Sequence, residues 1–211
     1  MSGLLVGLLI SLGGLALCAR LLDRNHLVGL PFAGMEMICM LLISLFAGKL
    51  VETGVGISNA GNILYAHVIA CQAVIFGRYG WKVSWNVINV IFLGVLFAVV
   101  MTQNIAHMPD AIPTNSSVAL DIAASAQRSS AAASMLAFYV AQCGFIGIMH
   151  VTRKWPFAIG FIAAACVAQF VDSAIFFPMQ FRGKFDGSLL EVAIVGFAVK
   201  ASCAIIAAPL V

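Results

Sequence analysis

Charged residues are scarce in this chain. Only 9% of its 211 residues are Asp, Glu, Lys or Arg, whereas 63% are hydrophobic. A soluble domain is about one quarter charged, so a soluble fold of this composition would expose apolar surface on every side. Lipid solvates such side chains, and the composition therefore predicts an integral membrane protein. The net charge of +3 is too small to favour nucleic-acid binding.

Several functional motifs are also missing. The sequence has no GxxxxGK[ST] loop for ATP, no GxSxG or HExxH motif, no repeated arginines of a voltage sensor and no TVGYG-like filter. Its six cysteines lie in apolar segments, and none forms a CxxC pair. We interpret them as packing residues rather than disulfides or metal ligands. We therefore expect neither an enzyme nor a cofactor or metal site.

Long apolar runs dominate what is present. Seven segments approach the roughly 20 residues that a helix needs to cross a bilayer, and helices satisfy their own backbone in lipid. They are residues 3–19, 27–47, 60–76, 83–102, 131–150, 156–178 and 188–208. We predict an all-α transmembrane helical bundle of about seven spans in a single domain, 1–211. The absence of basic residues before the first segment favours a retained helix at 1–20 over a cleaved signal peptide.

The connections between these segments indicate the orientation. The loops after the first, third and fifth segments carry six Lys or Arg residues, and those after the second, fourth and sixth carry four. This bias places the N-terminus outside and the C-terminus in the cytoplasm. The longest connection, 103–130, begins with turn-like residues. Its end is rich in small residues and is interpreted as a helical approach to the fifth segment.

Five ionisable residues stand out as candidates inside the apolar segments: Glu36, His67, Asp172, Glu191 and Lys200. A charge within the bilayer costs a few kcal/mol or more, so such residues usually face a cavity or a partner. We expect His67 to make a helix–helix hydrogen bond. Glu36 is a candidate for the same polar cavity as Asp172.

Asp172 lies in the stretch VAQFVDSAIFFPMQF, residues 167–181. Gln169 precedes it by three residues and Phe176 follows it by four, so all three share a helix face. With the adjacent Ser173, this stripe offers an amide, a carboxylate, a hydroxyl and a ring. The pattern is typical of a polar ligand site near the middle of the membrane.

Lys200 is the natural partner of Asp172. Their helices are joined by a short connection and should be antiparallel neighbours. Glu191 lies nine residues before Lys200, about two and a half turns away, and so on roughly the opposite face. Two interpretations of an Asp172–Lys200 pair stay open: an ion pair that only locks two helices, and a site that binds a ligand.

Four stretches carry a family resemblance. Their order along the chain resembles that of the vitamin-uptake transporter family. From the N-terminal side they are AGNILYAHVIACQAVIFGRYG, ASMLAFYVAQ with Gln142, AQFVDSAIFFPMQF and LLEVAIVGFAVKASCAIIAAPL. The best-known branch of that family is the YhhQ-type queuosine-precursor permeases. The resemblance covers about residues 55–210 and implies a six-helix core, with the first helix as an addition. The chain departs from the family pattern at Ala73 and Gly77, where members usually carry polar or charged residues.

The resemblance implies import of 7-deazaguanine bases, such as the cyano or aminomethyl precursors of queuosine, by secondary or facilitated transport. A guanine-like edge presents two N–H donors and a carbonyl, which a carboxylate and a lysine or amide can read, while an aromatic ring stacks on the base. The implied substrate-binding residues are Asp172, Gln169, Lys200, Gln142, Glu36, Ser173, Phe176 and Glu191, with Trp85 as a second stacking candidate.

Three other functions remain open from the sequence. The chain is an alternative candidate for the substrate-binding membrane subunit of an ATP-driven vitamin or nucleobase importer. A membrane enzyme would need a nucleophile or a metal set at the polar cluster, and neither is visible. A purely structural membrane protein would use the ion pair only as a lock. The expected partners are a nucleobase-like small molecule and membrane lipid, and the small size also suggests a homodimer.

Overall fold

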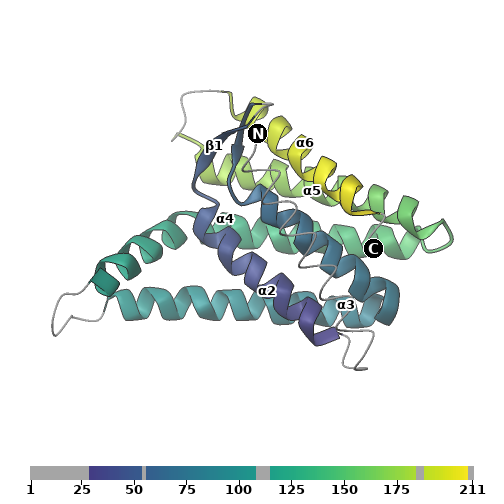
Figure 1. Cartoon of the computed structure of the whole chain (residues 1–211), viewed down its shortest axis with the longest axis horizontal. Coiled ribbons are helices and arrows are strands. Elements are labelled where there is room, and N and C mark those ends of the chain that lie inside the picture. Colours follow the sequence, from purple (N-terminus) through teal and green to yellow (C-terminus); the bar gives the residue numbers. More distant parts are fainter. Residues whose placement is uncertain (1–28, 54–55, 108–114, 184–187, 209–211) are drawn as a thin grey trace.

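The computed structural model describes residues 29–53, 56–107, 115–183 and 188–208, so the predicted first helix at 3–19 lies outside the described residues. The described elements are helices α2 (Gly29–Phe46), α3 (Asn62–Ala106), α4 (Asn115–Val151), α5 (Phe157–Phe181) and α6 (Leu189–Ala207), with strands β1 (Leu50–Thr53) and β2 (Gly56–Asn59). Figure 1 shows these helices crossing in a bundle, with the strands at one end. The predicted all-α fold is confirmed.

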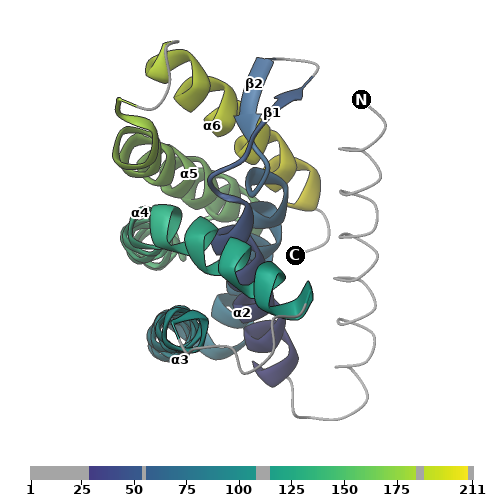
Figure 2. The ribbon, with the colours of Figure 1, turned by 90° about the vertical axis from the view of Figure 1, so that its left-hand side faces the viewer.

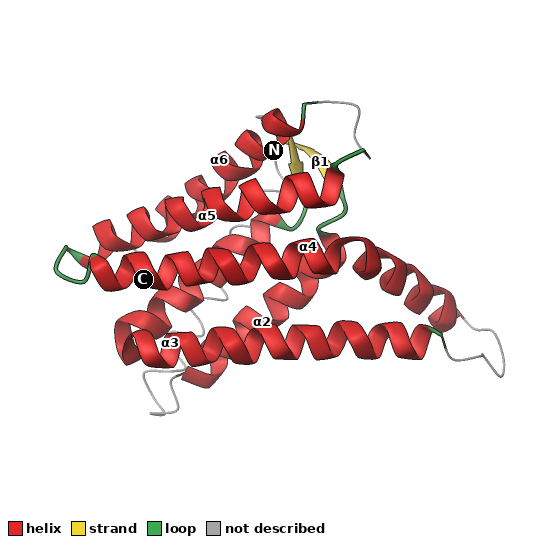
Figure 3. Cartoon of the chain, turned by 180° about the vertical axis from the view of Figure 1, so that it is seen from behind, coloured by secondary structure: helices red, strands yellow, loops and turns green. Residues whose placement is uncertain are grey.

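Helix α3 contains two of the predicted segments. Gly80, at its midpoint, has φ 76° and ψ 179°, which interrupts the helix. Glycine adopts this backbone conformation readily because it has no Cβ. The chain changes direction there, and Figure 3 shows the bend from behind. A 45-residue helix would be about 68 Å long if straight, roughly twice the apolar thickness of a bilayer. The predicted break at 77–82 is therefore confirmed.

The other helices agree with the predicted segments. Four described stretches are long and apolar enough to cross a membrane, namely Leu64–Ala106, Ser130–Val151, Phe157–Phe181 and Leu189–Ile206, and Pro31–Phe46 is a shorter apolar helix. Helix α4 begins at Asn115, so the predicted helical approach to the fifth segment is present as its first turns. The five described cysteines form no disulfide.

The helices are arranged in two layers. Figure 2 shows α5 and the second halves of α3 and α4 nearly end on in one row, with α2 and the first half of α3 beside them. Helix α6 packs against α5 and α3. On the outer side of this row, Leu93 is 61% exposed and Phe97 is 67% exposed. These apolar faces fit contact with lipid rather than with water.

Strands β1 and β2 form a small antiparallel hairpin that the sequence analysis treated only as a break between helices. Leu50 pairs with Asn59, and Val51 pairs with Ser58. The hairpin contacts α6 through β2. The Asn59 side chain donates to the Ala47 carbonyl and accepts from the Gly61 N–H, so it ties the hairpin to the end of α2. The hairpin therefore covers one end of the bundle.

Candidate functional site

A buried ion pair joins helices α5 and α6. The Lys200 ammonium donates a hydrogen bond to the Asp172 carboxylate. Lys200 is 1% exposed and Asp172 is 3% exposed, so water screens this pair weakly. The predicted meeting of these two residues is confirmed. Antiparallel packing of α5 and α6 across a short connection places the two charges at the same depth.

Two aromatic rings surround the lysine. Its Nζ lies 4.8 Å from the centre of the Tyr65 ring and 6.0 Å from that of Phe177. A cation held over an aromatic face is attracted by the electron density of the ring. Tyr65 also lies within electrostatic range of Asp172, although its hydroxyl makes no hydrogen bond of good geometry among the described residues.

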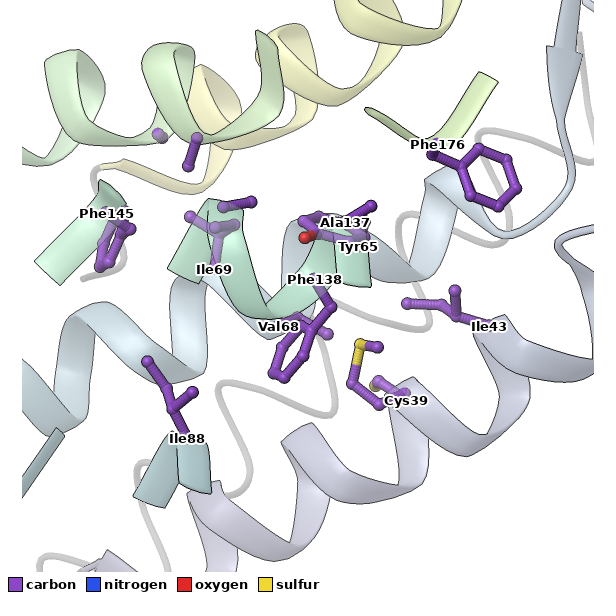
Figure 4. Close-up of a cluster of buried hydrophobic side chains, with 14 of the residues drawn as sticks. Cys39, Ile43, Tyr65, Val68, Ile69, Ile88, Ala137, Phe138, Phe145 and Phe176 are labelled. Carbon is purple, nitrogen blue, oxygen red and sulfur yellow. The ribbon is translucent and has the colours of Figure 1, made fainter. Parts of the chain in front are cut away.

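The pair borders a cavity that five helices and the hairpin share. The lining residues are Ile43, Ala47, Asn59, Gly61, Asn62, Tyr65, Ser134, Asp172, Phe176 and Lys200. Figure 4 shows Tyr65 of α3 with Ile43 of α2 and Phe176 of α5 near this region. The free space is about 10 Å³, which is room for roughly one water molecule. The site is therefore closed around its charges in this conformation.

Close packing at Gly196 brings α6 against α3 and α5. A Cβ on Gly196 would lie 2.7 Å from two ring carbons of Phe177 and 3.1 Å from the Asn62 amide nitrogen. A methyl group does not fit at these distances. The missing side chain of Gly196, one turn before Lys200, therefore lets the lysine approach Asp172 and Tyr65.

Unpartnered polar groups extend from the cavity into the bundle. Gln142 and Gln169 are fully buried, and neither amide has a hydrogen-bond partner among the described residues. The Ser173 and Ser134 hydroxyls are buried and unpartnered in the same sense. Ser134 lines the cavity, whereas the two glutamines and Ser173 do not. Buried polar groups usually have a partner, so this density of unpaired ones is typical of a place where a polar ligand binds.

Glu36 lies apart from the cavity lining. It is fully buried on α2, and neither carboxylate oxygen has a hydrogen bond within the described part of the chain. Cys39, on the same helix, and Tyr65, on α3, are within electrostatic range of it. Glu36 therefore lies outside the cavity lining but within electrostatic range of Tyr65, which does line the cavity.

Glu191 and Trp85 lie outside the cavity. Glu191 is exposed in the first turn of α6, where its N–H donates to the Ser188 hydroxyl. An acidic residue at this position favours the helix start. Trp85 packs 6.3 Å from the Tyr139 ring. The structure does not bring either residue together with the Asp172–Lys200 pair.

The two departures from the family pattern have a packing explanation. Ala73 is fully buried in the main apolar cluster. A Cβ on Gly77 would lie 3.1 Å from two ring carbons of Phe157. Phe157 therefore occupies the space that a side chain at 77 would need, and a charged residue there would displace this ring.

Tyr65 is the residue that sequence reasoning missed. It occurs in ILYAHVIA, where an aromatic residue reads as ordinary core. The signal that could have found it is its helix register, because Tyr65 and Ile69 are four residues apart and face the same way.

Residues 59–211 match the model of a family described as "putative vitamin uptake transporter". The chain belongs to this family. The match begins at the end of β2 and covers α3 to α6, including every ionisable residue that lines the cavity. No curated protein and no solved structure matches the chain. As a member of a transporter family built from long apolar helices, the protein is an integral membrane protein.

Proposed function

We propose that the protein imports queuosine precursors, 7-deazaguanine bases such as 7-cyano-7-deazaguanine or its aminomethyl form, by secondary or facilitated transport. The proposed location is a bacterial inner membrane, with the C-terminus in the cytoplasm. The family supports uptake of a small molecule across a membrane. The observation that carries the finer proposal is the cavity in which a buried carboxylate and a buried ammonium lie beside aromatic rings.

The charges at the cavity suit the edge of a guanine-like base. A carboxylate accepts two adjacent N–H groups, and an ammonium donates to a carbonyl. In the closed conformation Asp172 and Lys200 satisfy each other. A base that offers both donors and an acceptor can replace each partner, so that neither charge is left buried and unpaired.

The rings at the cavity suit the faces of the same base. Tyr65 and Phe176 both line it, from α3 and α5. A flat heteroaromatic ring gains contact area and offset stacking between such side chains. Phe176 in turn packs edge to face against Phe177, at 5.4 Å between ring centres, and this contact restrains its orientation.

Uptake of a labelled 7-deazaguanine tests the proposal. The chain would be produced in bacteria that cannot make their own queuosine precursor, beside Asp172→Asn and the control Glu52→Gln at equal membrane abundance. Glu52 is an exposed residue of β1. We expect uptake by the parent chain and by the control, and a loss of about tenfold or more in Asp172→Asn, because hydrogen bonds to a charged group contribute about 1.5–3 kcal/mol.

Two results would overturn the proposal. One is an absence of deazaguanine uptake by the parent chain, and the other is undiminished uptake by Asp172→Asn. Uptake into vesicles that contain only the purified chain would separate a permease from the binding subunit of an ATP-driven importer, since the chain has no ATP-binding loop.

A further inference from the structure

Glu36 does not line the cavity, yet it is one of the most deeply buried polar residues described. Its side chain is 0% exposed, and both carboxylate oxygens lack a hydrogen bond from any described residue. Burying a carboxylate without a cation or a hydrogen bond is costly, whereas the neutral acid avoids most of that cost. The closed conformation therefore favours a proton on Glu36.

Among the described residues, no basic side chain forms a hydrogen bond or an ion pair with Glu36. Lys200 already pairs with Asp172. His67 is buried in α3, but it follows Tyr65 by two residues and so points about 200° away around the helix. Cys39 and Tyr65 lie within electrostatic range of Glu36, and both are neutral in their ordinary forms.

Helices α3 and α4, the described helices packed against α2, place no charged side chain in contact with Glu36. Helix α2 contacts α3 and α4. The titratable residues in the membrane part of α4 are Tyr139, Cys143 and His150. Tyr139 donates to Asn89 on the second half of α3, Cys143 is half-buried, and His150 is exposed beside Trp81.

Tyr65 connects Glu36 to the cavity. It lies within electrostatic range of both Glu36 and Asp172, and its ring lies under the Lys200 ammonium. A base that binds at the ion pair would contact the same ring. Movement of Tyr65 on binding would therefore change the surroundings of Glu36, which is the physical requirement for coupling between two sites.

We propose that Glu36 binds the proton that drives uptake, so that the protein works as a proton symporter for its base. This inference rests on the proposed function. With the bundle open to the outside, a carboxylate oxygen of Glu36 takes a proton from water and forms an O–H bond. Closure of the bundle removes water and retains the neutral acid. With the bundle open to the cytoplasm, the O–H bond breaks and the proton returns to water.

The coupling follows from the difference between the open and closed conformations in the free energy of an ionised Glu36. The closed conformation buries this side chain without a partner among the described residues, so closure is disfavoured while Glu36 is ionised. A chain that closes around a base therefore carries one proton with it, and no other reactant is needed. Glu36 lies outside residues 59–211, which match the family, on helix α2 where that helix packs against α3.

Proteoliposomes containing the purified chain test the symport. With an inward proton gradient of one pH unit, we expect the parent chain to accumulate labelled base up to about tenfold and to carry protons with it. Glu36→Gln should bind the base and exchange it across the membrane, yet show no accumulation above the outside concentration and no substrate-driven proton flux. Glu52 is an exposed glutamate on β1, so Glu52→Gln is the matched control and should behave as the parent chain.

Infrared difference spectra test the protonation of Glu36 without any substrate. The parent chain at neutral pH should show a buried carboxylic-acid carbonyl band that Glu36→Gln lacks. Glutamine is nearly isosteric with the neutral acid, so the variant should fold, and its thermal stability would be measured beside the spectra. Absence of the band in the parent chain, or proton-coupled accumulation by Glu36→Gln, would overturn the inference. If the parent chain fails to bind any deazaguanine, the proposed substrate is wrong, and the infrared band still decides whether Glu36 holds a proton.

Discussion

Removal of one charge from the Asp172–Lys200 pair should destabilise the protein strongly. In Lys200→Met, Asp172 would remain 3% exposed without its cation. Breaking a buried ion pair on one side costs about 3–5 kcal/mol, because the remaining charge is neither hydrated nor paired. For a chain of this length the loss corresponds to a fall of roughly 6–20 °C in melting temperature.

The double variant distinguishes the stability lost by removing both charges from the stability lost by leaving one charge unpaired. Asp172→Leu with Lys200→Met replaces both groups by apolar side chains, and such replacements of buried pairs are often neutral or stabilising. We expect the double variant to regain most of the stability that Lys200→Met loses. Thermal unfolding of the purified proteins in one detergent would measure all four members of the cycle.

The same cycle tests whether the pair is a lock or a site. If the ion pair only joins α5 to α6, apolar side chains can replace it, and the double variant would transport the base as well as the parent chain does. If the pair binds the base, the double variant would be stable and inactive, which is the result we expect. The reasoning would be refuted by a Lys200→Met protein as stable as the parent chain, or by a double variant as unstable as Lys200→Met.

Substitutions at three further positions have defined consequences. Gly196→Ala should lower stability by about 1–3 kcal/mol in thermal unfolding, because its methyl group would overlap the Phe177 ring and crowd Asn62; an unchanged melting temperature would contradict the close approach. Gly80→Ala should lower the free energy of unfolding by about 1–3 kcal/mol, because φ 76° with ψ 179° is a backbone conformation that essentially only glycine adopts; the same melting experiment would reveal it, and stabilisation would argue for a continuous helix. Tyr65→Leu should weaken base binding by roughly 2- to 15-fold through loss of an aromatic contact, whereas Tyr65→Phe should retain it, as measured by titration calorimetry; equal affinity for all three chains would exclude Tyr65 from the site.

Patterns along the chain were sufficient to predict the helices and the ion pair. Apolar length locates every described helix, because lipid leaves the backbone no other solution. The turn at Gly80 follows from GRYG between two apolar runs. Asp172 and Lys200 meet because a short connection makes their helices antiparallel neighbours. Each of these predictions depends on one helix or on two consecutive ones.

What the sequence could not predict depends on contacts between distant elements. The hairpin was treated as a break because LVETGVGISN is short and its glycines read as loop. Tyr65 becomes part of the site only when α3 is placed under α6. Glu191 lies within an apolar stretch, but its position as the third residue of α6 exposes it at the helix start. The position of a residue within an apolar stretch therefore does not predict whether its side chain is buried or exposed.

The size of the cavity has a consequence for the transport cycle. Space for roughly one water molecule cannot hold a two-ring base, so the proposed substrate would need the bundle to open before it could reach Asp172. The lining is shared by all five described helices and by the hairpin, and β2 itself contacts α6. The ion pair joins α5 to α6, and the Asn59 side chain joins the hairpin to the end of α2. A base that binds there would exchange the ion pair for its own hydrogen bonds, and the free energy of that exchange would accompany the opening.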